Sequence, residues 1–195
     1  MFSPLTKQLI DALRALPGIG PKNAQRLTYQ LLTDGGREKA RTLSEALKQA
    51  VLCVGQCVRC RQFTEQTLCS VCSNSKRDHA LLCVVETPVD VIALEQTHAF
   101  NGSYFVLHGH LSPLDGVTPE KIGIPQLLAL LQKESIREII LATNPTVEGK
   151  ATAQYIAARI DTTQMICSRI AHGVPMGGEL EFFDGTTLSH AFYAR

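Results

Sequence analysis

Four cysteines stand in two closely spaced pairs, and their spacing is that of a metal site. The pairs are Cys57-Val-Arg-Cys60 and Cys69-Ser-Val-Cys72, with eight residues between them. Two such pairs place four thiolates at the corners of a tetrahedron, which is the arrangement that Zn²⁺ takes in structural sites. Because sulfur fills all four positions, no position stays open for water. We therefore expect one structural Zn²⁺ ion per chain, without a catalytic role.

Two disulfides are the alternative use of these cysteines. We favour zinc because the N-terminus does not resemble a signal peptide, and a cytosolic chain keeps its thiols reduced. The insert 61–68 is too short to build a core, so metal binding would have to supply the folding energy of this segment. Cys53 lies four residues before Cys57 but lacks a paired cysteine, and we expect it to be a buried small apolar residue.

A second candidate site is a glycine-rich turn in residues 16–22. Gly18 and Gly20 permit a tight turn and the close approach of a ligand, and the proline that follows suits the start of a helix. Backbone N–H groups at a helix start can bind phosphate. Lys22 and Arg26 are four residues apart, so they lie on one helical face beside these groups. A plain connector between two helices is the alternative.

The distribution of charge favours a polyanion as the ligand of this turn. The net charge is only +1, but residues 1–78 carry 12 Lys+Arg against 6 Asp+Glu, whereas residues 79–195 carry 7 against 12. The N-terminal part therefore attracts nucleic acid and the C-terminal part repels it. Solvated surface charge is the alternative explanation. It applies equally to the basic residues of the zinc unit, which are Arg59, Arg61, Lys76 and Arg77.

A third candidate site lies in the acidic part of the chain. Glu86 follows the apolar run 80–85, and Asn144 to Glu148 follow the expected strand 138–142. If both segments are parallel strands, these residues lie at the carboxyl edge of one sheet, where ligands of such sheets bind. The sequence His108-x-His110 could also bind a metal, but it has no third ligand nearby, and we expect it to be an ordinary part of a loop.

The elements that position these sites follow from apolar periodicity. Helices are expected from Ser3-Pro4 and from Pro21, and a third over 37–54. The third has an apolar stripe that we expect to be buried, formed by Ala40, Leu43, Leu47, Ala50, Val51 and Val54. Strands and helices then alternate: strands at 80–85, 104–107, 138–142 and 165–170, and helices at 88–96, 125–132 and 149–160. This alternation predicts an α/β fold with a mostly parallel sheet flanked by helices.

Two of these segments resemble known modules. The turn at Gly18 and Gly20 resembles the hairpin of a helix-hairpin-helix module, which grips the DNA backbone without reading base sequence. The segment from Glu86 onward resembles a Toprim domain, the Mg²⁺-binding fold of topoisomerases and bacterial primases. That family uses a glutamate after the first strand and an Asp-x-Asp pair after a later one. Asn144-x-Thr146 stands in place of this pair, so two anionic ligands are missing and we expect no catalysis.

The order of these modules resembles the RecR family of bacterial recombination mediators. The segments that carry the resemblance are Phe63-Thr-Glu-Gln, Gly109-His-Leu-Ser-Pro-Leu-Asp-Gly116, Ala142-Thr-Asn-Pro-Thr-Val-Glu-Gly149, Ser168-Arg-Ile-Ala-His-Gly-Val-Pro175 and Gly177-Gly-Glu-Leu180. The resemblance implies a non-enzymatic DNA-repair factor that forms ring-like homotetramers. It also implies that the protein works with RecO and RecF to load RecA on gapped single strands coated with SSB.

The resemblance further implies a division of the chain and of its sites. The parts are a helix-hairpin-helix module at 1–54, a four-cysteine zinc finger at 55–78, a Toprim-like domain at 79–173 and a C-terminal oligomerisation segment at 174–195. Single- and double-stranded DNA would be bound without sequence preference, through Gly18, Gly20, Lys22 and Arg26. Partner proteins would be bound at the Toprim face, through Glu86, Asn144 and Glu148.

No apolar run is long enough to span a bilayer, so we expect a cytoplasmic protein, associated with the bacterial nucleoid and not with a membrane. Two other functions remain open. One is a Mg²⁺-dependent Toprim nuclease or primase-like enzyme, and the other is a zinc-bearing adaptor that does not contact DNA. Autonomous ATP hydrolysis is not expected, because the chain lacks the Gly-x-x-x-x-Gly-Lys-Ser/Thr loop that cradles phosphates.

Overall fold

The computed structural model describes residues 2–171, 173–174, 177 and 179–193. The chain forms two compact units, of which the first ends at Val54 and the second begins at Gly55. Residue 172 of the predicted Toprim-like domain lies outside the described residues, as do 175, 176, 178, 194 and 195 of the predicted oligomerisation segment. Among the helices of the described ranges, none has the length and apolar character needed to cross a lipid bilayer.

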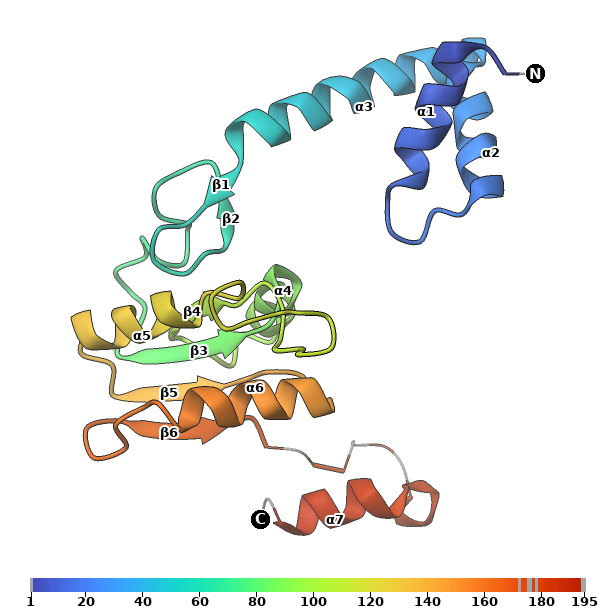
Figure 1. Cartoon of the computed structure of the whole chain (residues 1–195). Coiled ribbons are helices and arrows are strands. Elements are labelled where there is room, and N and C mark those ends of the chain that lie inside the picture. The colour runs from blue at the N-terminus through green and yellow to red at the C-terminus, as the bar shows by residue number, and fades with distance from the viewer. Residues whose placement is uncertain (1, 172, 175–176, 178, 194–195) are drawn as a thin grey trace. The chain divides into compact units, whose positions relative to one another are not determined.

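The first unit consists of three helices, as predicted (Figure 1). They are α1 (Pro4–Arg14), α2 (Pro21–Leu32) and α3 (Asp34–Cys53). Ser3 caps α1, because its hydroxyl accepts a hydrogen bond from the backbone N–H of Thr6 at 3.3 Å. The chain turns tightly between α2 and α3 at Thr33, and the buried Gly36 in the first turn of α3 packs so closely against α2 that a Cβ atom would collide with the backbone carbonyl of Gln30. Helix α3 begins three residues earlier than the predicted 37–54.

The apolar stripe of α3 is exposed, so the prediction that it is buried was wrong. The exposed fractions are 46% for Leu43, 57% for Leu47 and 80% for Val51. Gly36, in its first turn, is the one residue of α3 that is buried, and Ala40 is half-buried, whereas the first unit leaves Leu43, Leu47 and Val51 uncovered. Cys53 is also exposed, contrary to expectation. Apolar periodicity identifies the face that favours burial, but it does not identify what covers that face.

The second unit is built on a parallel sheet of four strands in the order β4-β3-β5-β6. All three neighbouring pairs are parallel, which confirms the predicted sheet. The strand bounds lie within two residues of those expected. Strand β3 is central, and its Val84 pairs with Phe105 on one side and Leu141 on the other. The strands are β3 (Leu81–Val85), β4 (Ser103–Val106), β5 (Glu138–Leu141) and β6 (Ile166–Arg169).

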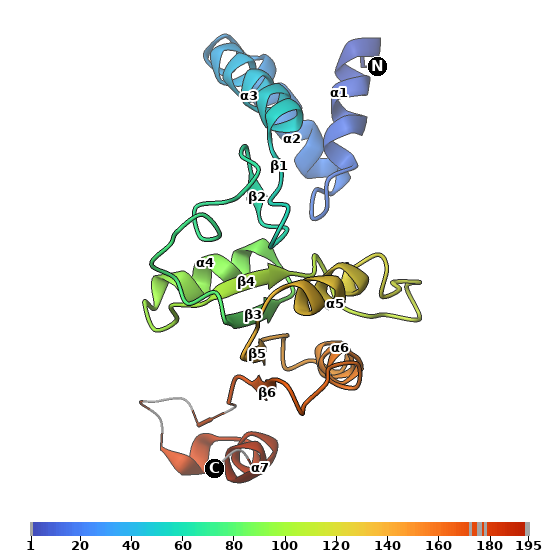
Figure 2. The same cartoon turned by 90° about the vertical axis from the view of Figure 1, so that its left-hand side faces the viewer.

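Helices cover both faces of this sheet, with α4 on one face and α5 and α6 on the other (Figure 2). Alternate residues of β3 serve the two faces. Leu82 and Val84 join the core beneath α5 and α6, whereas Cys83 and Val85 join the smaller core beneath α4. The sheet is thereby packed on both faces. The helices are α4 (Pro88–Gln96), α5 (Ile124–Lys133) and α6 (Val147–Ala157).

The remaining elements of the second unit are short. The cysteine segment contains an antiparallel pair, β1 (Gly55–Gln56) and β2 (Phe63–Thr64). After β6 come a 3-10 turn, Leu180–Phe182, and helix α7 (Gly185–Tyr193). Large apolar side chains are exposed in this last part of the chain, namely Leu180, Phe182 and Phe192.

Candidate metal centre and nucleic-acid interface

The four cysteines form one buried cluster. The Sγ atoms of Cys57, Cys60, Cys69 and Cys72 all lie within 4.8 Å of one another. Zn–S bonds of about 2.3 Å in a tetrahedron separate the sulfurs by about 3.8 Å. The Sγ atoms of Cys60 and Cys69 are 3.4 Å apart, near this spacing and far beyond a disulfide bond of about 2.05 Å. The cysteines are free, and their arrangement fits a four-coordinate metal ion rather than two disulfides.

The surroundings of the cluster favour a thiolate at Cys72, whereas the hydrogen bond with Cys72 and burial raise the pKa of Cys60, and burial raises the pKa of Cys69. A hydrogen bond from Cys60, followed in strength by one from Arg59, lowers the pKa of Cys72 to about 5. The guanidinium Nη1 of Arg59 lies 3.8 Å from the Sγ of Cys72. The backbone N–H of Gln62 points to the Sγ of Cys60 at 3.5 Å. Because metal ligands must be deprotonated, donors aimed at the sulfurs prepare the cluster for a cation.

Arg59 is held in this position by Glu134, at the carboxyl end of α5. Its Nε lies 2.9 Å and 3.1 Å from the two carboxylate oxygens, and its Nη2 lies 2.6 Å from Oε2. The side chains of Arg59 and Glu134 are 11% and 29% exposed. This fork-like pairing fixes the guanidinium plane and ties the cysteine segment to the helical layer. Arg59 is therefore a structural cation and not part of a basic surface.

Arg61 joins the cysteine segment to the sheet. Its guanidinium donates to the carbonyls of Ile122 at 2.7 Å and Leu107 at 3.3 Å. Its backbone has a φ of 64°, which side chains rarely adopt, so the surrounding contacts must hold it there. Gly123, at a φ of 75°, leaves the space that the guanidinium fills. A further bond runs from the N–H of Val106, on β4, to the carbonyl of residue 60 at 2.9 Å.

In the first unit, the glycine-rich turn presents an open backbone and two cations. Gly18 has a φ of 79° and no neighbouring atom where a Cβ would stand, so the chain there is accessible. Gly20 is the N-cap of α2 and has no side chain to cap the helix start. Lys22 and Arg26 are exposed on α2, and the described residues include no ion-pair partner for either. Phosphate groups fit such a surface.

At the carboxyl edge of the sheet, the structure brings Glu86 and Asn144 together. The backbone N–H of Asn144 donates to Oε1 of Glu86, and its side-chain Nδ2 donates to Oε2, both at 2.8 Å. The Nδ1 of His110 lies 3.3 Å from the same Oε2. His108 instead contacts the backbone oxygen of residue 61 at 2.7 Å. Glu148 is exposed in the first turn of α6 and has no hydrogen bond to Glu86.

These acidic residues do not form a metal cluster. Within the described ranges, only the four cysteines form a group of three or more His, Cys, Asp or Glu side chains close enough to share an ion. Hard divalent cations such as Mg²⁺ take several oxygen ligands. Glu86 shares no ion-sized cluster with a second described carboxylate, and both of its oxygens already accept hydrogen bonds.

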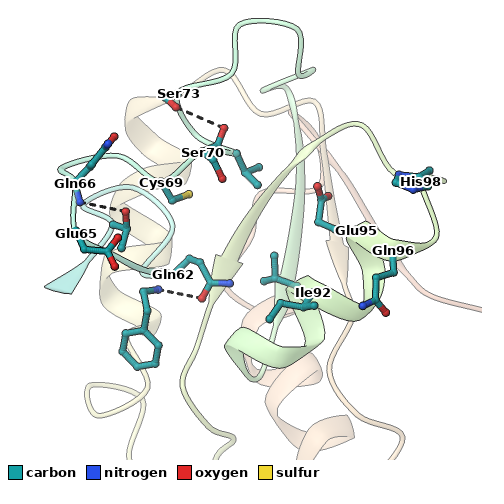
Figure 3. A pocket seen from close by; sticks show the side chains of 14 residues that line it. Gln62, Glu65, Gln66, Cys69, Ser70, Ser73, Ile92, Glu95, Gln96 and His98 are labelled. Carbon is teal, nitrogen blue, oxygen red and sulfur yellow. Dashed lines mark hydrogen bonds between the residues drawn. The ribbon is translucent and has the colours of Figure 1, made fainter. Parts of the chain in front are cut away.

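A groove of about 910 Å³ lies between the cysteine segment and α4. Figure 3 shows Gln62 and Cys69 from the cysteine segment and Ile92 from α4 around it. The 14 residues that line it include Glu65 and Glu95 and no Lys or Arg. A nucleic-acid backbone requires cations, so the chemistry of this groove does not suit it.

The sequence is similar to known proteins along its whole length. The sequence matches the families described as "RecR, helix-hairpin-helix" over residues 6–51, "Toprim domain" over 80–171 and "RecR, C-terminal" over 173–195. It aligns over all 195 residues with proteins named Recombination protein RecR. The identity is 62% with that of Coxiella burnetii, 57% with Pseudomonas putida and 54% with Saccharophagus degradans, covering 97%, 96% and 98% of those proteins.

Proposed function

Because this chain belongs to the RecR family, we propose that it is a DNA-binding mediator of recombinational repair. In this proposal it works with RecO and RecF to load RecA on gapped DNA coated with SSB, in the cytoplasm and at the nucleoid. The main support for DNA binding is the exposed turn at Gly18 and Gly20, which is followed by two exposed cations on α2. Such a surface contacts phosphates and leaves the bases unread, so binding is independent of sequence.

The DNA interface is tested by replacing Lys22 and Arg26 with alanine. Each cation that contacts a phosphate releases counterions, so the double variant should bind single- and double-stranded DNA more weakly, and the slope of log K against log salt should flatten by about 2. Fluorescence anisotropy over a range of salt concentrations measures both. The control is Lys39→Ala with Lys48→Ala on α3, which removes the same charge. Equal effects of the two pairs would show that net charge, and not the turn, governs binding.

We propose that the metal is one structural zinc ion, held by Cys57, Cys60, Cys69 and Cys72. Four buried thiolates are soft ligands that favour Zn²⁺ over Mg²⁺ or Ca²⁺. Elemental analysis of the purified protein should find one zinc per chain. Cys57→Ser should lose the metal and unfold the segment, whereas Cys53→Ser, in an exposed cysteine outside the cluster, should keep it. A full complement of zinc in Cys57→Ser would refute this ligand set.

We propose that the protein is not an enzyme. The support is the chemistry of the Toprim edge, where amide donors from Asn144 occupy the oxygens of Glu86. Purified protein should neither cut nor extend DNA in the presence of Mg²⁺. The competing function, a Toprim nuclease or primase-like enzyme, requires Mg²⁺-dependent turnover that disappears in Glu86→Gln.

We propose that partner proteins bind the same edge of the sheet, around Glu86, Asn144 and Glu148. Glu148 is the exposed acidic group of this edge, and charged groups of this kind steer protein association. Glu148→Lys should weaken binding to RecO or RecF in a pull-down with purified proteins and leave DNA affinity unchanged. A variant that binds both partners normally would remove Glu148 from the interface. Partner binding without any DNA binding would favour the adaptor function instead.

We propose that four chains form a homotetramer and that residues 174–195 take part in its assembly. Exposed apolar side chains support this, on α3 at Leu47 and Val51 and near the C-terminus at Phe182 and Phe192. Apolar surface of this kind is commonly covered by another protein surface. Native mass spectrometry with and without DNA should report a particle of four chains. A monomer under both conditions would refute the proposal.

A further inference from the structure

Glu86 is a buried carboxylate whose charge is satisfied by hydrogen-bond donors. It is 3% exposed, and a buried charge is costly unless it is paired or hydrogen-bonded. One residue supplies donors to both of its oxygens, through the backbone N–H and the side-chain amide of Asn144. A Mg²⁺ ion bound at Glu86 would have to displace these N–H groups, which point their positive ends at the carboxylate. The residues at this edge therefore do not fit the cation of the Toprim fold.

The loop after β5 is shaped to keep Asn144 in this position. It leads into α6, whose first turn is capped by Thr146, since the Thr146 hydroxyl accepts from the N–H of Gly149 at 3.0 Å. Gly149 packs so closely that a Cβ there would collide with the carbonyl of Asn144 and stand 2.7 Å from Oε1 of Glu86. The hydroxyl of Thr143 donates to the carbonyl of Gly149 at 2.7 Å. These bonds hold the loop in a fixed conformation beside Oε1 of Glu86.

We infer that Asn144 takes the structural place of a divalent cation at Glu86. Its two N–H groups bridge both carboxylate oxygens, so this edge of the sheet holds its shape without Mg²⁺. An aspartate at this position, as in the Asp-x-Asp pair of Toprim enzymes, would remove one donor and set a second negative charge against the first. Mg²⁺ would then be needed to hold the edge together. This role of Asn144 is a property of the fold and does not require DNA or partner proteins to bind.

The test compares thermal unfolding of the full chain, loaded with zinc, with and without excess Mg²⁺. Chelators are left out, because they would strip the cysteine cluster. For Asn144→Asp we expect the midpoint to fall by roughly 5–10 °C without Mg²⁺ and to recover with it, because like charges in contact destabilise and a shared cation reverses this. The wild-type midpoint should not respond to Mg²⁺. If Mg²⁺ does not restore the unfolding midpoint of Asn144→Asp, the inference is overturned.

A charge-swapped control separates the bridge from a general loss of packing. In the double variant Glu86→Gln with Asn144→Asp, the introduced glutamine amide can donate to the new carboxylate, and the glutamine carbonyl can still accept the backbone N–H. The stability of this variant should return towards wild type without Mg²⁺ and should not change when Mg²⁺ is added. Calorimetric titration with Mg²⁺ compares wild-type protein with Glu86→Gln, and the wild-type protein should give no binding heat. Binding heat that disappears in Glu86→Gln would overturn the inference directly.

Discussion

Replacing Arg59 with alanine tests whether the metal centre depends on a residue outside its four ligands. Arg59 bonds both oxygens of Glu134 and points Nη1 at the Sγ of Cys72 at 3.8 Å. In the proposed site, a zinc ion with four thiolates would carry a formal charge of about −2, and the guanidinium would compensate part of it. The substitution removes this compensation and leaves the Glu134 carboxylate without its partner.

The expected cost follows from the burial of the pair. Exposed ion pairs contribute about 0–1 kcal/mol, and breaking a fully buried pair costs about 3–5 kcal/mol. With side chains 11% and 29% exposed, Arg59 and Glu134 lie between these limits, so we expect Arg59→Ala to lower the free energy of unfolding by about 2 kcal/mol. Loss of the donor to Cys72 should weaken metal binding by about 10- to 100-fold, as for other residues that support metal ligands.

Two measurements decide this prediction. Urea unfolding followed by far-UV circular dichroism gives the stability, since the chain has no Trp for fluorescence. Transfer of zinc to a coloured chelator gives metal retention. Arg59→Lys keeps the charge but not the fork, and should lie between alanine and wild type. Arg59→Ala with Glu134→Ala should cost less than the sum of the two single variants. Wild-type zinc release and an unchanged urea midpoint in Arg59→Ala would refute the reasoning.

Three further predictions concern the second unit. Gly123→Ala should lower stability by about 2–3 kcal/mol in the same urea assay, because its φ of 75° disfavours a side chain and the new methyl would collide with Arg61. Hydrogen bonding to Arg77, and secondarily to Tyr104, holds the pKa of Glu95 below its usual range, so its stabilisation is present at neutral pH and lost as pH falls through the folded pKa. Glu95→Gln should therefore be less stable than wild type at neutral pH, and the difference in urea midpoint should vanish in acid; a difference that persists would contradict the assignment. Burial raises the pKa of Cys83 to about 12, so a thiol reagent should label exposed Cys53 quickly in native protein and spare Cys83, as peptide mass mapping would show.

The parts of the structure that sequence predicted depend on short-range rules. The cysteine spacing fixed the cluster, because coordination geometry limits the loop between ligands. Alternation of strands and helices predicted the parallel sheet, and parallel topology then placed Glu86 and Asn144 at one edge. Their mutual hydrogen bonds were not predicted, since the approach of two loops 58 residues apart depends on packing.

The parts that sequence missed depend on partners distant in the chain. Arg59 and Glu134 are 75 residues apart, and Arg59 was expected on a surface. One signal was present: Glu134 follows the last turn of a helix, where the helix dipole disfavours a negative charge, so a cationic partner was needed. For the apolar stripe of α3 the prediction was wrong in the opposite direction, because we expected it to be buried and it is exposed. Leu43 and Val51 repeat as buried residues do, yet the first unit provides no surface to cover them.

The seating of Arg61 has a practical consequence for anyone dissecting this protein. A fragment that began after the cysteines would leave the carbonyls of Leu107 and Ile122 without their donor, and it would strip the end of β4 of its bond to residue 60. The cysteine segment is thus an integral part of the α/β domain. It cannot be removed, or moved to another protein, as an independent zinc finger can. A truncation should instead be placed between Val54 and Gly55, at the boundary of the two compact units.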